Sequence, residues 1–118
     1  VITFECAGSD GKDLPLFTDL ETVKKFAIGV VNHTNTVVES PQQVANLIRR
    51  ALEFVPAERL IISTDCGFGR EGISRRIAFH KCVSLVQGTN IVRKELGLHE
   101  ATVRAADPQF AFSEPTRN

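Results

Sequence analysis

Short apolar segments alternate three times with longer amphipathic segments, and this alternation constrains the fold more than any other feature. The apolar segments are residues 1–5, 27–31 and 59–64, which are rich in valine and isoleucine. Each is followed by a segment whose apolar residues recur at helical spacing. Short strands that alternate with amphipathic helices form parallel sheets covered by helices, so the sequence predicts an α/β fold. We expect the first strand to be buried on both faces.

The first two predicted helices differ in how clearly their ends are marked. The first spans residues 14–26, with Thr18 or Asp19 as a candidate N-cap and apolar residues at steps of three: Phe17, Leu20, Val23 and Phe26. The second begins at Ser40, which can form a capping box with Gln43, and ends before Pro56.

The third predicted helix spans residues 74–96 and ends at Gly97. Helical spacing predicts that its inward face carries Ile77, Cys82, Leu85, Val86, Val92 and Leu96. No clear period continues beyond it. We therefore predict a domain at residues 1–97 and a C-terminal tail at residues 98–118.

Polar side chains follow the carboxyl end of each predicted strand. Glu5 ends the first strand, Asn32 and His33 follow the second, and Asp65 and Cys66 follow the third. Ligands of parallel sheets bind at the carboxyl ends of the strands, in open sheets and in closed barrels alike. The sequence therefore predicts that these five residues share one rim and form a functional site there.

Each of these residues has a chemical interpretation and a plainer one. Cys66 could be a nucleophile, a metal ligand or a small buried residue. Glu5 could be a metal ligand or a salt-bridge partner. His33 could be an ordinary loop histidine, but it is the best acid–base candidate at this rim. Arg70 could bind an anionic substrate or lie in solvent. Cys6 should point away from Glu5, because neighbouring residues of a strand face opposite sides.

Gly67, Gly69 and Gly72 have the spacing of a dinucleotide-binding turn, G-x-G-x-x-G. That motif needs a second strand after the helix and an acidic residue about 20 residues further on. Here the nearest acid, Glu95, falls inside the helical pattern, and no convincing strand follows. A nicotinamide-binding domain therefore remains only a weak alternative.

Composition excludes several classes of function. The chain of 118 residues carries 14 Lys and Arg against 14 Asp and Glu, so it lacks the basic surface that nucleic acid requires. No apolar segment is long enough to span a membrane. Three cysteines, with no close pair, favour a reducing cytoplasm over a disulfide framework. The chain begins with Val1 inside a predicted strand, so we expect it to be part of a longer protein.

The segments VITFE and IGVVNHTNTVVESPQQVANLIRRALEFVPAERLIISTDCGFG resemble the C-terminal end of the cobalamin-independent methionine synthase superfamily. The resemblance covers residues 1–96 and is strongest to the shorter homologues, a branch that includes the epoxyalkane:coenzyme M transferases. It implies that the chain supplies the last three β/α units of a TIM barrel.

The resemblance also implies a zinc site. Its Glu ligand falls on Glu5, its final Cys ligand on Cys66, and its histidine proton donor on His33. The family's other two ligands, a His-x-Cys pair after an earlier strand, are expected outside these residues. Asn32, Asp65 and Arg70 are our candidates for substrate binding.

The implied activity is zinc-dependent transfer of a methyl or alkyl group to a thiol. The thiol would be of the homocysteine or coenzyme M type, and the donor a folate or an epoxide. The remaining barrel strands, or a second copy, would complete the sheet. The alternative is a non-catalytic fragment or a subunit that completes a barrel without holding the full zinc site.

Overall fold

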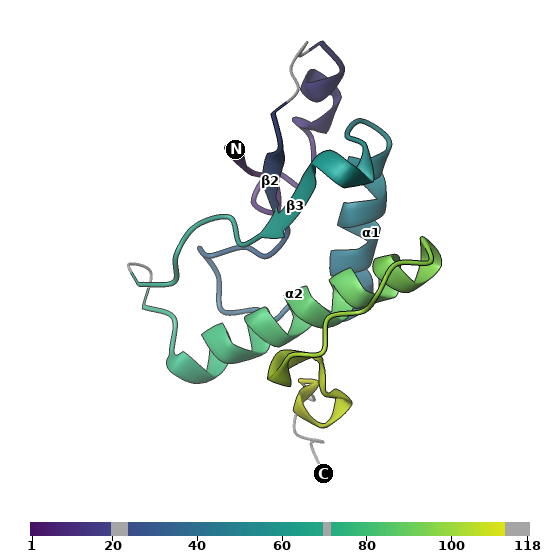
Figure 1. The fold of residues 1–118 in the computed structure, drawn as a ribbon. Helices are drawn as coiled ribbons and strands as arrows, with labels where there is room; N and C mark the ends of the chain where they lie inside the picture. The colour runs from purple at the N-terminus through teal and green to yellow at the C-terminus, as the bar shows by residue number, and fades with distance from the viewer. Residues whose placement is uncertain (20–23, 70–71, 113–118) are drawn as a thin grey trace.

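A computed structural model describes residues 1–19, 24–69 and 72–112, which form a small parallel sheet and two long helices (Figure 1). The strands are β1 (Ile2–Glu5), β2 (Phe26–Gly29) and β3 (Leu60–Ser63), arranged side by side in the order β1-β2-β3. Both pairs are parallel, which confirms the predicted α/β fold. Glu5, Gly29 and Ser63 lie in one register row, so all three strands end at the same rim.

The helices are α1 (Pro41–Leu52) and α2 (Arg75–Glu95). The predicted capping box is present, since the Ser40 hydroxyl accepts from the Gln43 N–H and the Gln43 side chain accepts from the Ser40 N–H. Ser74 caps α2 by accepting from the Ile77 N–H, and Gly97 follows the helix with φ +72°. No helix among the described residues is long and apolar enough to cross a membrane.

Short 3-10 helices complete the chain: η1 (Leu14–Asp19), η2 (Ala57–Arg59), η3 (Arg104–Ala106) and η4 (Pro108–Phe110). The segment after α2 packs back on that helix. The Asn90 side chain donates to the Ala101 carbonyl and accepts from the Ala101 N–H, at 3.0 and 2.7 Å. The Gln87 side chain donates to the Asp107 carbonyl at 3.0 Å.

The helix predicted at residues 14–26 is wrong in its second part. Thr18 and Asp19 end η1 instead of capping a helix, and Phe26 begins β2. Leu20 and Val23 lie outside the described residues. The ring centroids of Phe17 and Phe26 are 5.1 Å apart, so their apolar spacing reflects contact between two elements of the core instead of one helical face.

The first strand is not buried on both faces, contrary to expectation. Ile2 and Phe4 are half-buried on the core side, whereas Thr3 and Glu5 are exposed. β2, between its two neighbours, is buried along its whole length. The described residues thus cover one face of β1 and leave open the face that carries Glu5.

The face of α2 also differs from the prediction. Cys82 is exposed and Leu96 is 48% exposed, whereas the inward expectation holds for Val92, which is buried, and for Leu85, which packs against the core. Three of the buried residues of the helix are polar, namely Lys81, Ser84 and Asn90, and the others are Val83, Gly88 and Val92.

Candidate metal centre

Glu5, His33 and Cys66 come together at the carboxyl end of the sheet, each from a different strand end. One ligand atom from each lies within 4.8 Å of the other two. Glu5 and Cys66 are exposed and His33 is half-buried. Side chains separated by up to 61 positions in the sequence therefore converge as predicted, because parallel strands end at one rim.

His33 has an unusual environment within this cluster. Its Nδ1 atom is buried and has no hydrogen-bond partner among the residues that the structure describes. Buried polar atoms are nearly always hydrogen-bonded, and an unpaired one commonly indicates an ion or a catalytic role. The unpaired nitrogen therefore makes His33 a candidate for a functional role at this rim.

Glu5 and Cys66 are residues that fit a zinc ion, and His33 lies close enough to act beside it. Carboxylate oxygen, imidazole nitrogen and thiolate sulfur are the ligand atoms that zinc takes in proteins. Ligands about 2.0–2.3 Å from a tetrahedral ion lie roughly 3.3–3.8 Å from one another. The ligand atoms of Glu5 and Cys66 lie within 4.8 Å of each other, which is close to that spacing.

Asp65 connects the segment after β3 to the backbone after β1 and β2. Its Oδ1 accepts from the Cys6 and Ala7 N–H groups at 2.9 and 3.0 Å, and its Oδ2 accepts from the Gly8 N–H at 2.7 Å. Its own N–H donates to the Val31 carbonyl at 3.0 Å. The residue is 5% exposed. Asp65, our candidate for substrate binding, thus has its carboxylate occupied by the backbone after β1.

Asn32 shapes the loop that carries His33. Its side-chain oxygen accepts from the Thr34 N–H and hydroxyl at 2.8 and 2.7 Å, and its own N–H donates to Glu39 Oε2 at 2.6 Å. Such turns fix the backbone locally. The remaining substrate candidate, Arg70, lies outside the described residues.

One His-x-Cys triplet does occur in the sequence, as His80-Lys81-Cys82, but it cannot supply the two further zinc ligands. It lies within α2, where residues two apart point to nearly opposite sides of the helix. His80 Nδ1 lies 3.2 Å from the Phe110 carbonyl oxygen, and Cys82 is exposed elsewhere on the helix. The triplet lies inside a helix and not at the carboxyl end of a strand.

The glycine turn lacks the surroundings of a dinucleotide site. Gly72 has φ +68°, a conformation that favours glycine, while side chains at Gly67 or Gly69 would meet no atom within 4 Å. No strand follows α2 in residues 98–112, where a dinucleotide fold needs its next strand. The glycines therefore fit a turn that brings Cys66 to the rim.

The expectation that Cys6 points away from Glu5 is confirmed, because Cys6 is fully buried in the core. Burial, helped by the negative charges of Asp65 and Asp13, raises the pKa of the Cys6 thiol to about 11. The thiolate is the reactive form of cysteine. Cys6 should therefore react slowly for two reasons: reagents cannot reach it, and its raised pKa keeps the thiol protonated.

Alkylation should therefore distinguish the cysteines. With iodoacetamide at pH 8 we expect the exposed Cys66 and Cys82 to be modified in minutes, and Cys6 to react at least roughly 100-fold more slowly. Mass spectrometry of peptides from timed samples measures each rate. Equal rates at Cys6 and Cys66 in the folded protein would contradict this arrangement.

Sequence reasoning missed Lys81, which is completely buried, and its partner Glu39. A signal was present, since Lys81 lies four residues after Ile77 and four before Leu85. Residues at that spacing share one helical face. A lysine between two inward positions indicates either an exposed face or a buried ion pair, and the structure has the ion pair.

Comparisons with known proteins agree with these observations. A family described as "Cobalamin-independent synthase, Catalytic domain" matches residues 1–87. The chain is 45% identical over 85 residues to a methionine synthase of Thermococcus kodakarensis, and 43% identical over 86 residues to one of Saccharolobus solfataricus. Each alignment covers 68% of this chain and 25% of the relative, so the chain spans about a quarter of these relatives' length.

A solved structure is also similar. It is a B12-independent methionine synthase from a Shewanella species in complex with selenomethionine, and it matches with a TM-score of 0.73 and 34% identity. The match covers 80% of this chain and 27% of that one. That protein is a TIM barrel, and the three parallel strands with their helices correspond to part of it, as the sequence predicted.

Proposed function

Because this chain belongs to the cobalamin-independent methionine synthase family, we propose that it forms part of a zinc-dependent transferase that methylates or alkylates a thiol. The observation that carries the proposal is the convergence of Glu5, His33 and Cys66 at the carboxyl end of a parallel sheet. In TIM barrels this end of the strands holds the active site.

Glu5 and Cys66 would hold the zinc ion, together with two ligands from the rest of the barrel. When bound, zinc lowers the pKa of a substrate thiol, so that the nucleophilic thiolate is present at neutral pH. Cys66 suits a permanent ligand, because a thiolate binds zinc tightly. Glu5 suits an exchangeable one, because it is exposed on the open face of β1.

His33 would give a proton to the group that leaves as the thiolate attacks. An imidazole can gain or lose a proton near neutral pH, so it can serve as a general acid. The buried Nδ1 without a partner supports this role, because no described residue competes for it. The Asn32 turn would hold the ring toward Glu5 and Cys66, while Asp65 fixes the backbone after β1.

For the substrate, the relatives favour a thiol of the homocysteine type. The matched proteins are named methionine synthases, and the solved relative holds selenomethionine, the selenium form of the product. A folate would then be the methyl donor. Coenzyme M with an epoxide is the second candidate. We propose Asn32 and Arg70 as contacts to the substrate, in a protein that works in the cytoplasm without nucleic acid.

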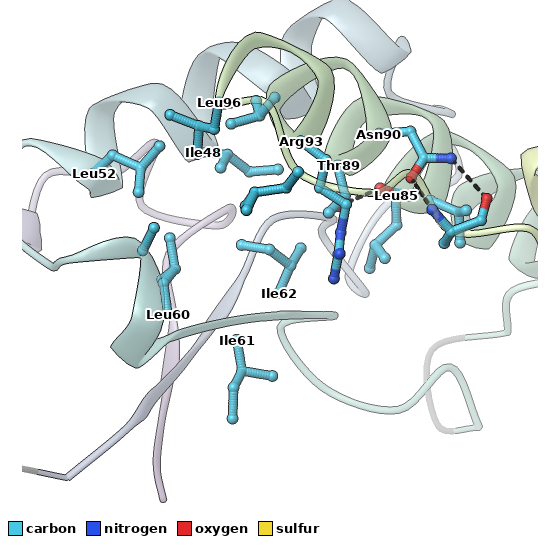
Figure 2. A pocket seen from close by; sticks show the side chains of 15 residues that line it. Ile48, Leu52, Leu60, Ile61, Ile62, Leu85, Thr89, Asn90, Arg93 and Leu96 are labelled. Atoms are coloured by element: carbon cyan, nitrogen blue, oxygen red, sulfur yellow. Dashed lines mark hydrogen bonds between the residues drawn. The ribbon is translucent and has the colours of Figure 1, made fainter.

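The partners of the sheet would be the remaining barrel strands. β1 and β3 are the edges of the three-stranded sheet, and unpaired edges recruit further strands. An apolar groove of about 340 Å³ lies between β3 and the helices α1 and α2, and Leu60, Ile62 and Leu85 are among the residues that line it (Figure 2). We propose that neighbouring barrel elements cover it. A second copy of the chain is the other candidate.

The alternative function is a non-catalytic piece that completes a barrel without a full zinc site. It is favoured by one observation, that only two of the four expected ligands lie at the rim in this chain. The two hypotheses predict different results in a methyl-transfer assay: the zinc-dependent transferase has activity, whereas the non-catalytic piece has none.

We expect zinc-loaded natural protein containing this chain to transfer a methyl group from methyl-folate to homocysteine. His33→Gln should lower kcat by roughly 10²- to 10⁴-fold while zinc remains bound, because the proton donor is lost. His99→Gln, at an exposed position, is the matched control. Residues 1–118 alone should show no turnover. Full activity of His33→Gln, or its loss of zinc, would contradict the role of His33.

A further inference from the structure

We propose that Lys81, on a helix that contributes no residue to the cluster, is a positioning residue for His33. The fully buried Lys81 and the half-buried Glu39 form an ion pair that fixes the loop of residues 32–39, and this loop carries His33. The inference rests on the proposed function only for the chemistry that His33 performs. Its structural content, that Lys81 sets the position of the His33 ring, can be tested separately.

The Lys81 ammonium group is fully buried and fully engaged. It donates to Glu39 Oε1 at 2.8 Å, to the Val37 carbonyl at 2.7 Å and to Asn35 Oδ1 at 3.2 Å. An ammonium group has three N–H donors, so all of them have acceptors, and all three acceptors belong to the same loop. A buried charge with this set of partners specifies one loop conformation.

Glu39 carries the connection onward to His33. While Oε1 accepts from Lys81, Oε2 accepts from the N–H of Asn32 at 2.6 Å, the residue directly before His33. On the other side, Thr34 donates to the Asn32 side chain. His33 is therefore held on both flanks by a chain of contacts that ends at Lys81.

The loop has no helix or strand of its own to fix it. The ion pair supplies partners for two of its part-buried backbone groups, the Asn32 N–H and the Val37 carbonyl. Without the pair, several loop conformations become comparable in energy, and the His33 ring loses its fixed distance to Glu5 and Cys66.

The helix that carries Lys81 is itself held rigidly. α2 crosses α1 at Gly88, where an added Cβ would lie 2.5 Å from Val44 Cγ1 and 2.7 Å from the Pro41 carbonyl oxygen. This close approach leaves little freedom for α2 to shift. Lys81 lies two turns before Gly88 on the same helix. Its position relative to the loop that precedes α1 is therefore fixed.

The test uses Lys81→Met in the natural protein, with Lys94→Met, at an exposed position of the same helix, as the matched control. In histidine-labelled protein we expect the narrow His33 ring resonance to broaden or split in Lys81→Met, while the His99 resonance is unchanged. We also expect kcat to fall roughly 10- to 100-fold, with KM for the thiol unchanged within about twofold. The control should match the wild type in both measurements.

An unchanged His33 resonance in folded Lys81→Met would overturn the inference. If Lys81→Met does not fold, Glu39→Gln serves instead, because it removes the charge and keeps the side-chain shape. The same broadening of His33 supports the inference, and an unchanged resonance overturns it. If the wild type shows no methyl transfer, the proposed function fails, yet the resonance still tests whether Lys81 positions His33.

Discussion

Replacing Gly29 with alanine is expected to destabilise the protein by more than about 3 kcal/mol, because the added methyl group has no room. An added Cβ would lie 2.2 Å from Asp65 Oδ1, 2.5 Å from the Asp65 Cα and 2.8 Å from its backbone nitrogen. Two of these atoms belong to the backbone and cannot rotate away. Either β2 or the turn after β3 must shift as a whole.

The same substitution should also disturb the rim. Asp65 cannot move without losing the hydrogen bonds that its carboxylate accepts from the N–H groups of Cys6, Ala7 and Gly8. A buried donor left without a partner costs about 1–3 kcal/mol. The clash and the lost hydrogen bonds therefore act together.

Chemical denaturation of the natural protein, followed by circular dichroism, measures the effect as a change in midpoint. Gly67→Ala is the matched control, because a Cβ there meets no atom within 4 Å and the backbone has no positive φ. We expect the control to stay within about 0.5–1 kcal/mol of the wild type. A Gly29→Ala protein as stable as the Gly67→Ala protein would refute the close packing of Asp65 on β2.

The sequence sufficed to predict the rim because parallel strands impose a simple rule. Once three strands alternate with helices, their carboxyl ends must meet, and Glu5, His33 and Cys66 come together without knowledge of any contact. The start of α1 was equally readable, since Ser40 and Gln43 form a local capping box that depends on no distant residue.

Features that depend on tertiary contacts could not be predicted in this way. Phe26 continues an apolar spacing that begins at Phe17, and only the packing of the rings against Phe4 shows that two elements meet there. Cys82 has the polarity of a buried residue but lies on the exposed side of α2, while Lys81 takes a buried place. Burial of a lysine requires acceptors from a loop 42 to 46 positions away.

Asp65 illustrates the same limit within the site. A carboxylate at the end of a strand suggested contact with a substrate, but the three backbone N–H groups that surround it come from the turn after β1. Sequence alone cannot distinguish a carboxylate that faces a ligand from one that binds the backbone, because both occur at strand ends.

The largest functional effect should come from replacing Cys66 with alanine. Loss of a partner that only supports a metal ligand costs about 10- to 100-fold in metal affinity, so loss of a ligand itself should cost more than about 100-fold. Cys82→Ala is the matched control, since it removes an exposed cysteine of α2 that lies outside the cluster. Both variants should fold, because neither side chain lies in the core.

The zinc content of the dialysed natural protein, measured together with these two variants, tests the central claim most directly. We predict one zinc ion per chain in the wild type and in Cys82→Ala, and loss of both zinc and methyl transfer in Cys66→Ala. Stoichiometric zinc in folded Cys66→Ala would contradict the claim that Cys66 is a metal ligand at the rim of this sheet.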